Sequence, residues 1–168
     1  MHSRNFKIST LIYCFNASDE ILLMNRIRPP NQGLWSPPGG KLHQDIGESP
    51  HACAAREAQE ELGIKANAQD FRLSGIVSEK GYEGEHHWMM FLFEYTHTLL
   101  HIPANHSEGN FEFFSPNQVD QLEIPKTDKT FIWPLFQKYR MGFFAAECIC
   151  RPDGSFTWQT LQSSLNSA

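Results

Sequence analysis

Three glutamates in the middle of the chain, Glu57, Glu60 and Glu61, have a spacing that could bind a metal ion. On a helix each residue advances by about 100°, so these carboxylates project within one half of the helix surface. Carboxylates grouped in this way repel one another, and a bound cation is the usual way to neutralise them. An all-oxygen set suits Mg²⁺ or Mn²⁺ rather than zinc. The alternative is a solvated acidic helix face with Arg56 and Glu60 as an i,i+4 ion pair.

The residues around these glutamates predict the helix that carries them. Ser49 is a suitable N-cap, Pro50 suits the first helical position, and Gly63 stands where a helix usually ends. The stretch between them, residues 51–62, contains no glycine or proline. A second, small or apolar stripe would let the helix lie close to a sheet; it consists of Ala55, Ala58 and Leu62.

The stretch from Pro37 to Ile64 resembles the Nudix box, the loop-helix-loop signature of Nudix hydrolases. In that signature a glycine is followed by five residues, Glu, seven residues, Arg-Glu, a hydrophobic residue, any residue, Glu-Glu, any residue, Gly and a hydrophobic residue. From Glu48 onward every fixed position matches, and upstream seven residues rather than five separate Gly40 from Glu48. We expect the two extra residues, within 41–47, to lengthen the loop without moving the glutamates.

The resemblance implies a metal-dependent active site. The three glutamates of the predicted helix would be catalytic and would bind Mg²⁺, or Mn²⁺, with one carboxylate activating water. In this family the carbonyl corresponding to Gly39 commonly supplies another ligand, and a glutamate outside the box often joins the cluster. Glu108, just before a predicted strand, occupies the corresponding position, and Glu83 and Glu85 are alternatives.

The resemblance also assigns structural and substrate-binding roles. Arg56 and Glu48 are expected to pair with each other and fix the loop, while Gly40 and Gly63 are structural positions of the box. A further set is expected to contact the substrate: Arg26, Arg28, Ser36, Lys41 and Asp128. For the two arginines of this set, a purely solvated position is an equal alternative.

The remaining chain predicts strands and two further helices. Residues 6–15 and 20–27 are rich in β-formers and flank a turn, which predicts a hairpin. Further strands are expected at 71–79, 87–98 and 111–114, and a final hairpin at 143–151 and 155–158, followed by a frayed tail from residue 163. Helices are expected at 117–122 and 128–140, the latter kinked or delayed by Pro134.

This order is compatible with the fold that the resemblance implies, an α/β/α sandwich with a mixed sheet between helices. No repeat or low-complexity linker interrupts the chain, so we expect one domain over residues 1–168, ordered from about 5 to 160. The net charge is −5 and no Lys/Arg-rich run is present. These features argue against duplex nucleic-acid binding, and no apolar run reaches membrane-spanning length. Four cysteines without zinc-type spacing favour reduced thiols and a cytoplasmic protein.

The expected reaction is Mg²⁺-dependent hydrolysis of a nucleoside diphosphate-linked substrate. The segments around the box resemble the branch that cleaves nucleoside triphosphates, including 8-oxo-dGTP, to monophosphate and pyrophosphate. The alternatives are an ADP-ribose or nucleotide-sugar pyrophosphatase, and a Nudix-like module that binds a nucleotide without cleaving it. The small-molecule nucleotide is the only partner that the sequence predicts, and the oligomeric state stays open.

Overall fold

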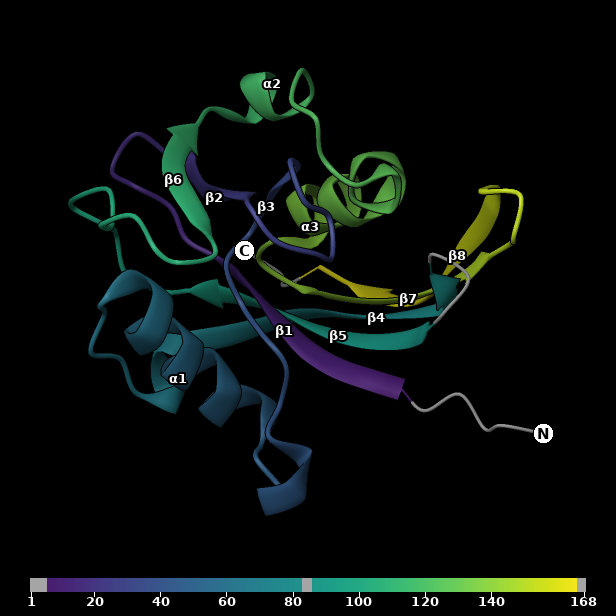
Figure 1. Ribbon diagram of the computed structural model, residues 1–168, viewed down its shortest axis with the longest axis horizontal. Helices are drawn as coiled ribbons and strands as arrows, with labels where there is room; N and C mark the ends of the chain where they lie inside the picture. Colours follow the sequence, from purple (N-terminus) through teal and green to yellow (C-terminus); the bar gives the residue numbers. More distant parts are fainter. Residues whose placement is uncertain (1–5, 83–85, 166–168) are drawn as a thin grey trace.

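The computed structural model describes residues 6–82 and 86–165, in which a five-stranded mixed sheet lies between helices (Figure 1). Its strands in spatial order are β1 (Phe6–Tyr13), β5 (His86–Tyr95), β4 (Phe71–Tyr82), β7 (Phe143–Cys150) and β8 (Phe156–Ser164). The β1–β5 and β4–β7 pairs are parallel, and the other two pairs are antiparallel. The predicted α/β/α arrangement with a mixed sheet is therefore confirmed.

Two hydrophobic clusters, one on each face of this sheet, hold the layers together. Successive residues of β1 point to opposite faces: Ile12 joins the cluster under helix α1 (Pro50–Leu62), and Tyr13 joins the cluster under helix α3 (Trp133–Tyr139). This alternation follows from the two-residue period of a strand. Strand β1 is consequently covered on both faces, by α1 on one side and by α3 on the other.

A second, antiparallel sheet contains the strand that was predicted to form a hairpin with β1. This sheet has the order β3 (Trp35–Ser36), β2 (Ile21–Arg26), β6 (Gly109–Phe114). The hairpin prediction was wrong, because β1 and β2 belong to different sheets and only the isolated bridge between Phe15 and Ile21 joins their ends. Local patterns identify two strands and a turn, but a strand's partner depends on which edges the rest of the fold supplies.

Helix α1 begins and ends where its sequence predicts. The N–H of Ala52 donates to Ser49 Oγ at 3.2 Å, and Gly63, at φ 68°, donates to the last helical carbonyls. Short elements complete this region: 3-10 turns η1 (Gln44–Ile46) and η2 (Ala68–Asp70), and helix α2 (Pro116–Val119).

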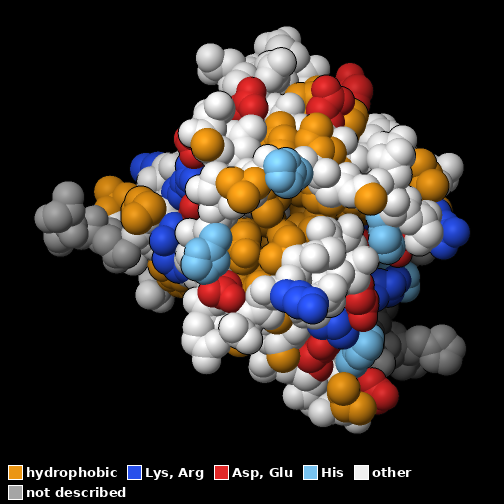
Figure 2. All heavy atoms as spheres, turned by 90° about the vertical axis from the view of Figure 1, so that its left-hand side faces the viewer, with side chains coloured by type: hydrophobic (Ala, Val, Ile, Leu, Met, Phe, Trp, Pro, Cys, Tyr) orange, Lys and Arg blue, Asp and Glu red, His pale blue; other side chains and the backbone are white. Residues whose placement is uncertain are grey.

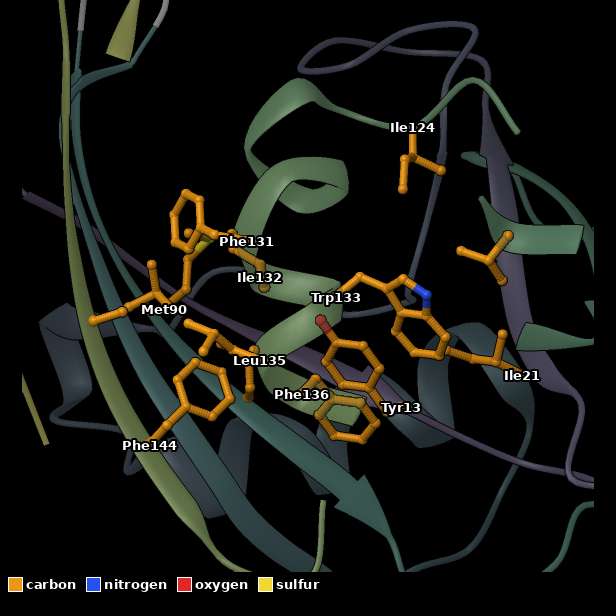
Figure 3. Packing of buried hydrophobic residues seen from close by; sticks show 14 of the residues in the cluster. Tyr13, Ile21, Met90, Ile124, Phe131, Ile132, Trp133, Leu135, Phe136 and Phe144 are labelled. Carbon is orange, nitrogen blue, oxygen red and sulfur yellow. The ribbon is translucent and has the colours of Figure 1, made fainter. Parts of the chain in front are cut away.

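The predicted C-terminal helix consists of a π-helical segment, η3 (Asp128–Ile132), followed by α3. Pro134 has no N–H to donate to a carbonyl in the preceding turn, which explains why regular α-helix begins only next to it. Figure 3 shows Phe136 and Leu135 of this helix packed toward Tyr13 and Phe144 of the sheet, and the ring of Phe131 stacks on Trp158 of β8 at 5.0 Å. The helix thereby fixes Asp128 above the same sheet.

The final hairpin of β7 and β8 is confirmed, although it is longer than predicted. Ser163 and Ser164, which were expected to fray, pair with Phe144 and Phe143. At the other end of the molecule, the face that carries α1 and β6 has a hollow where hydrophobic side chains gather among charged and histidine side chains (Figure 2). None of the helices in the described part of the chain has the length and apolar character needed to cross a membrane.

Candidate active site

A single cleft of about 490 Å³ collects most of the predicted site residues. The members that line it are Arg26, Ser36, Gly39, Gly40, Lys41, Arg56, Glu57, Glu60, Glu61, Glu108 and Asp128. Arg28 is exposed and does not line the cleft, although its neighbours Pro29 and Pro30 do. The fold therefore brings one of the two candidate arginines to the site. Glu83 and Glu85 lie outside the described residues.

Gly39 and Gly40 allow the loop of the box to pass tightly between β1 and α1. Gly39 has a φ of 147°, and a Cβ there would collide with the carbonyl oxygen of Thr10. A Cβ on Gly40 would collide with the carboxyl group of Glu57. Because both side chains are absent, the Gly39 N–H can donate to Glu61 Oε2 at 2.9 Å. This hydrogen bond joins the loop backbone directly to a glutamate of the box helix.

Arg56 connects the loop to the helix, as predicted. Its Nε and Nη2 donate to the two oxygens of Glu48 at 2.8 and 3.0 Å, and Nη2 also donates to the Lys41 carbonyl at 3.0 Å. This pairing lowers the pKa of Glu48 to about 2. Nη1 lies 2.7 Å from Glu57 Oε1 and 3.2 Å from Glu60 Oε2. The guanidinium thus contacts two of the three glutamates of the box helix.

Burial makes the box carboxylates costly to ionise. Glu61 is 6% exposed, and this burial, reinforced by the charges of Glu57 and Glu108, raises its pKa to about 8 although Gly39 donates to it. Burial also raises the pKa of Glu57. Glu60, on the exposed side of the helix, remains open to solvent. A cation placed among these groups would favour their charged forms.

The donor set fits a hard divalent cation in its chemistry, since every member is an oxygen. No three His, Cys, Asp or Glu side chains within 6–82 and 86–165 already converge as a metal site. The ion pairs explain this arrangement: Arg56 holds Glu57 and Glu60, and Arg26 Nη2 lies 3.6 Å from Glu108 Oε2. Three of the expected ligands thus contact a guanidinium through one carboxyl oxygen each.

A second acidic group lines the same cleft, away from the box. Asp128 is half-buried and lines the cleft. Burial, together with the charge of Glu79, raises its pKa to about 8. Glu79, on β4, is 3% exposed, and burial raises its pKa to about 7. Our sequence reasoning missed Glu79. A signal was available, namely a carboxylate two residues after the apolar Val77, on the same face of a buried strand.

Ser36 and Lys41, the remaining predicted substrate contacts, both line the cleft. Ser36 is buried at the end of β3, where it pairs with Met24 of β2. Lys41 is exposed, and its Nζ lies 5.9 Å from the centre of the Trp88 ring. The wall of the cleft thus places an ammonium group close to an aromatic side chain of the sheet.

Comparisons with known proteins agree with this geometry. The model of the NUDIX domain matches residues 5–136. An RNA pyrophosphohydrolase from Erythrobacter litoralis is 26% identical over 127 residues, which cover 66% of this chain and 76% of that protein. A human diphosphoinositol polyphosphate phosphohydrolase is 33% identical over 96 residues, or 56% of this chain, and this chain spans about half the length of that relative (49%).

Solved structures show the same fold. The crystal structure of a MutT protein from Bacillus halodurans superimposes with a TM-score of 0.70 at 24% identity, covering 93% of this chain and 98% of that one. The family match extends over most of the chain and includes the loop, the helix and the cleft described above. The chain therefore belongs to the NUDIX family and is a hydrolase that acts on pyrophosphate bonds.

Proposed function

We propose that this hydrolase converts a purine nucleoside triphosphate, oxidised purines included, to the monophosphate and pyrophosphate with Mg²⁺ or Mn²⁺. A water oxygen forms a bond to one phosphorus of the α–β anhydride. The bond from that phosphorus to the bridging oxygen breaks, and its electrons leave with the other phosphate group. The proton released by the water passes to a carboxylate and then to solvent, so atoms and charges balance.

The observation that carries this proposal is the presence of two separate acidic groups in one cleft. In the box group, the charges of Glu57 and Glu108 help to raise the pKa of Glu61, which lines the cleft with them. In the second group, the charge of Glu79 helps to raise the pKa of Asp128, and both line the same cleft. The first group can bind phosphates through a bound cation, and the second group can form hydrogen bonds with the edge of a base. A nucleotide has both chemical ends in one molecule.

The roles of the box residues follow from their contacts. Bound at Glu57, Glu60, Glu61, Glu108 and the Gly39 carbonyl, a divalent cation would offset phosphate charge and acidify water. One of the box carboxylates takes the proton of the attacking water. Arg56 and Glu48 hold the loop and helix together, so they position the carboxylates.

The phosphates and the base have different protein partners. Arg26 and Lys41 line the cleft beside the box and supply positive charge for phosphate oxygens. Ser36 and Asp128 supply a hydroxyl and a carboxyl group for the base. Asp128 has a raised pKa, so at neutral pH it can donate a hydrogen bond as well as accept one.

The test is a hydrolysis panel with purine triphosphates, pyrimidine triphosphates, nucleotide sugars and ADP-ribose in Mg²⁺. We expect purine triphosphates to have the highest kcat/KM. D128A should reduce the preference for purines by roughly ten- to a hundred-fold while leaving metal-dependent cleavage of the poorest substrate unchanged. D153A, in the exposed turn between β7 and β8, is the matched control. Faster cleavage of ADP-ribose than of every triphosphate would contradict the proposal.

A further inference from the structure

Glu79 is a buried carboxyl group in the wall of the cleft that the reaction itself does not require. Only 3% of the residue is exposed, and its Oε1 has no hydrogen-bond partner among the described residues. The hydroxyl of Thr127 donates to the carboxyl group, so one of its two oxygens is satisfied. A buried polar atom without a partner is unfavourable. A hydrogen-bond donor of a ligand in the cleft would supply the missing partner of Glu79 Oε1.

The ammonium groups of Lys7 and Lys41 lie 5.4 and 5.9 Å from the ring centre of Trp88, the strand partner of Glu79, but form no ion pair with Glu79. The groups around it are Asp128 on η3, the thiols of Cys148 and Cys150 on the neighbouring strand β7, and Trp88, its partner on β5. None of the ion pairs between described residues includes Glu79 or Asp128. Both carboxyl groups therefore line one cleft without an ion-pair partner among the described residues.

Burial and, for Asp128, the charge of Glu79 raise the pKa values of both carboxyl groups, so we expect the two groups together to retain a proton at neutral pH. With one proton, the pair offers one hydrogen-bond donor and several acceptors. This combination differs from that of two carboxylates, which only accept. The cleft thus presents a defined set of donors and acceptors on one wall.

We propose that Glu79 is a second base-contacting residue, which acts with Asp128 as a carboxyl pair that binds the lactam edge of a guanine-type base. This inference rests on the proposed function, because it assigns the base of the same substrate. The O–H of the protonated carboxyl group donates to the ring carbonyl, and the remaining carboxyl oxygens accept from the ring N–H and the exocyclic amino group.

An adenine-type edge fits the same pair less well. An adenine edge presents one amino donor and one ring-nitrogen acceptor. The charged carboxylate of the pair would therefore have no second N–H group to accept from. Trp88 supports the assignment of this wall to the base, because directly opposed residues of an antiparallel pair share a face of the sheet. An aromatic ring beside the carboxyl pair is suited to contact the flat face of a base.

The test is calorimetric binding of GMP and AMP, without divalent cation, to the wild type and to the variants E79M and E79Q. Because this measurement involves no cleavage, its outcome is independent of whether triphosphates are hydrolysed. E147M and E147Q, on neighbouring strand β7 and outside the cleft, are matched controls. Thermal melts establish that each variant is folded. E79Q retains a donor and an acceptor in the same shape, whereas E79M retains neither.

We expect the wild type to bind GMP at least about tenfold more tightly than AMP. E79M should lose this preference, E79Q should keep part of it, and both controls should keep all of it. A wild type that binds both nucleotides equally, or neither, overturns the proposal. Retention of the full preference by folded E79M overturns it as well. If the preference is lost as expected but the wild type cleaves no triphosphate, the base assignment stands and the proposed reaction fails.

Discussion

Arg56 and Glu48 form a two-point ion pair, with Nε 2.8 Å from Oε1 and Nη2 3.0 Å from Oε2. The same guanidinium reaches the Lys41 carbonyl in the loop and the carboxyl groups of Glu57 and Glu60 on the helix. Loop and helix are consequently tied by one side chain. The planar fork of arginine, with its five donors, is what makes this set of contacts possible.

R56K should preserve the charge and lose this geometry. A lysine ammonium cannot bond both oxygens of Glu48 and also reach the loop carbonyl, so the free energy of unfolding should fall by about 1–2 kcal/mol. Urea denaturation measures the change, with R151K at an exposed position as control. An R56K protein as stable as the wild type would show that this contact set contributes little.

E61Q should reduce kcat by at least ~10²-fold while the protein remains folded. Glu61 is buried beside Gly39 and Glu57, and the substitution removes a charge and a ligand oxygen while preserving the side chain's shape. Steady-state kinetics in saturating Mg²⁺ measures the effect, and E112Q, on the exposed side of β6, is the control. Near-full activity in E61Q would remove Glu61 from the metal site.

Deleting Gln44 and Asp45 should leave metal binding unchanged. These residues belong to the exposed turn η1, whose ends are already joined because Glu48 N–H donates to the His43 carbonyl and His43 N–H donates to Glu48 Oε2. A shorter loop between the same ends is therefore feasible. We expect the Mg²⁺ dissociation constant to change by less than about threefold. Isothermal titration measures it, and loss of binding by a folded deletion variant would place the extra residues in the site.

The metal-free protein should lose stability as the pH rises from 5 to 8. The folded pKa values of Glu79 and Asp128, about 7 and about 8, lie above their ordinary values of 4.5 and 3.8. In this window the folded protein keeps protons that the unfolded chain has released, so the free energy of unfolding falls with pH. We expect a decrease of at least about 1 kcal/mol.

The double variant E79M/D128N should show a smaller decrease over the same range, because neither replacement titrates there. Denaturant unfolding at pH 5, 6.5 and 8, with a chelator present, makes the comparison. Other buried carboxyl groups, Glu61 among them, contribute with the same sign, so the dependence should weaken rather than vanish. An identical slope in the double variant would show that the pair does not hold its protons in the folded state.

The helix of the box could be predicted because its signals are local. Ser49, Pro50 and Gly63 define its ends through contacts that span only a few residues. The pairing of Arg56 with Glu48 also followed from the box pattern. The partner of β2 could not be predicted, because it is set by β6, which lies some ninety residues later in the chain. The same limit applied to Arg28, which does not line the cleft although its neighbours Pro29 and Pro30 do.

Glu79 illustrates a different limit. Its position on an apolar strand is visible in the sequence, but its meaning depends on Asp128, which arrives from the distant segment η3. Only the packing of η3 and α3 against the sheet brings the two carboxyl groups to one wall. Clusters assembled from separate elements are therefore found in the structure, whereas clusters within one helix are found in the sequence.

The most direct test of the proposed function is phosphorus NMR of the products formed from GTP and Mg²⁺ in ¹⁸O-labelled water. The account predicts GMP and pyrophosphate, with one ¹⁸O atom in a product phosphate next to the cleaved α–β anhydride, and no product when a chelator replaces Mg²⁺. Orthophosphate and GDP as the first products, or equal turnover without divalent cation, would contradict it.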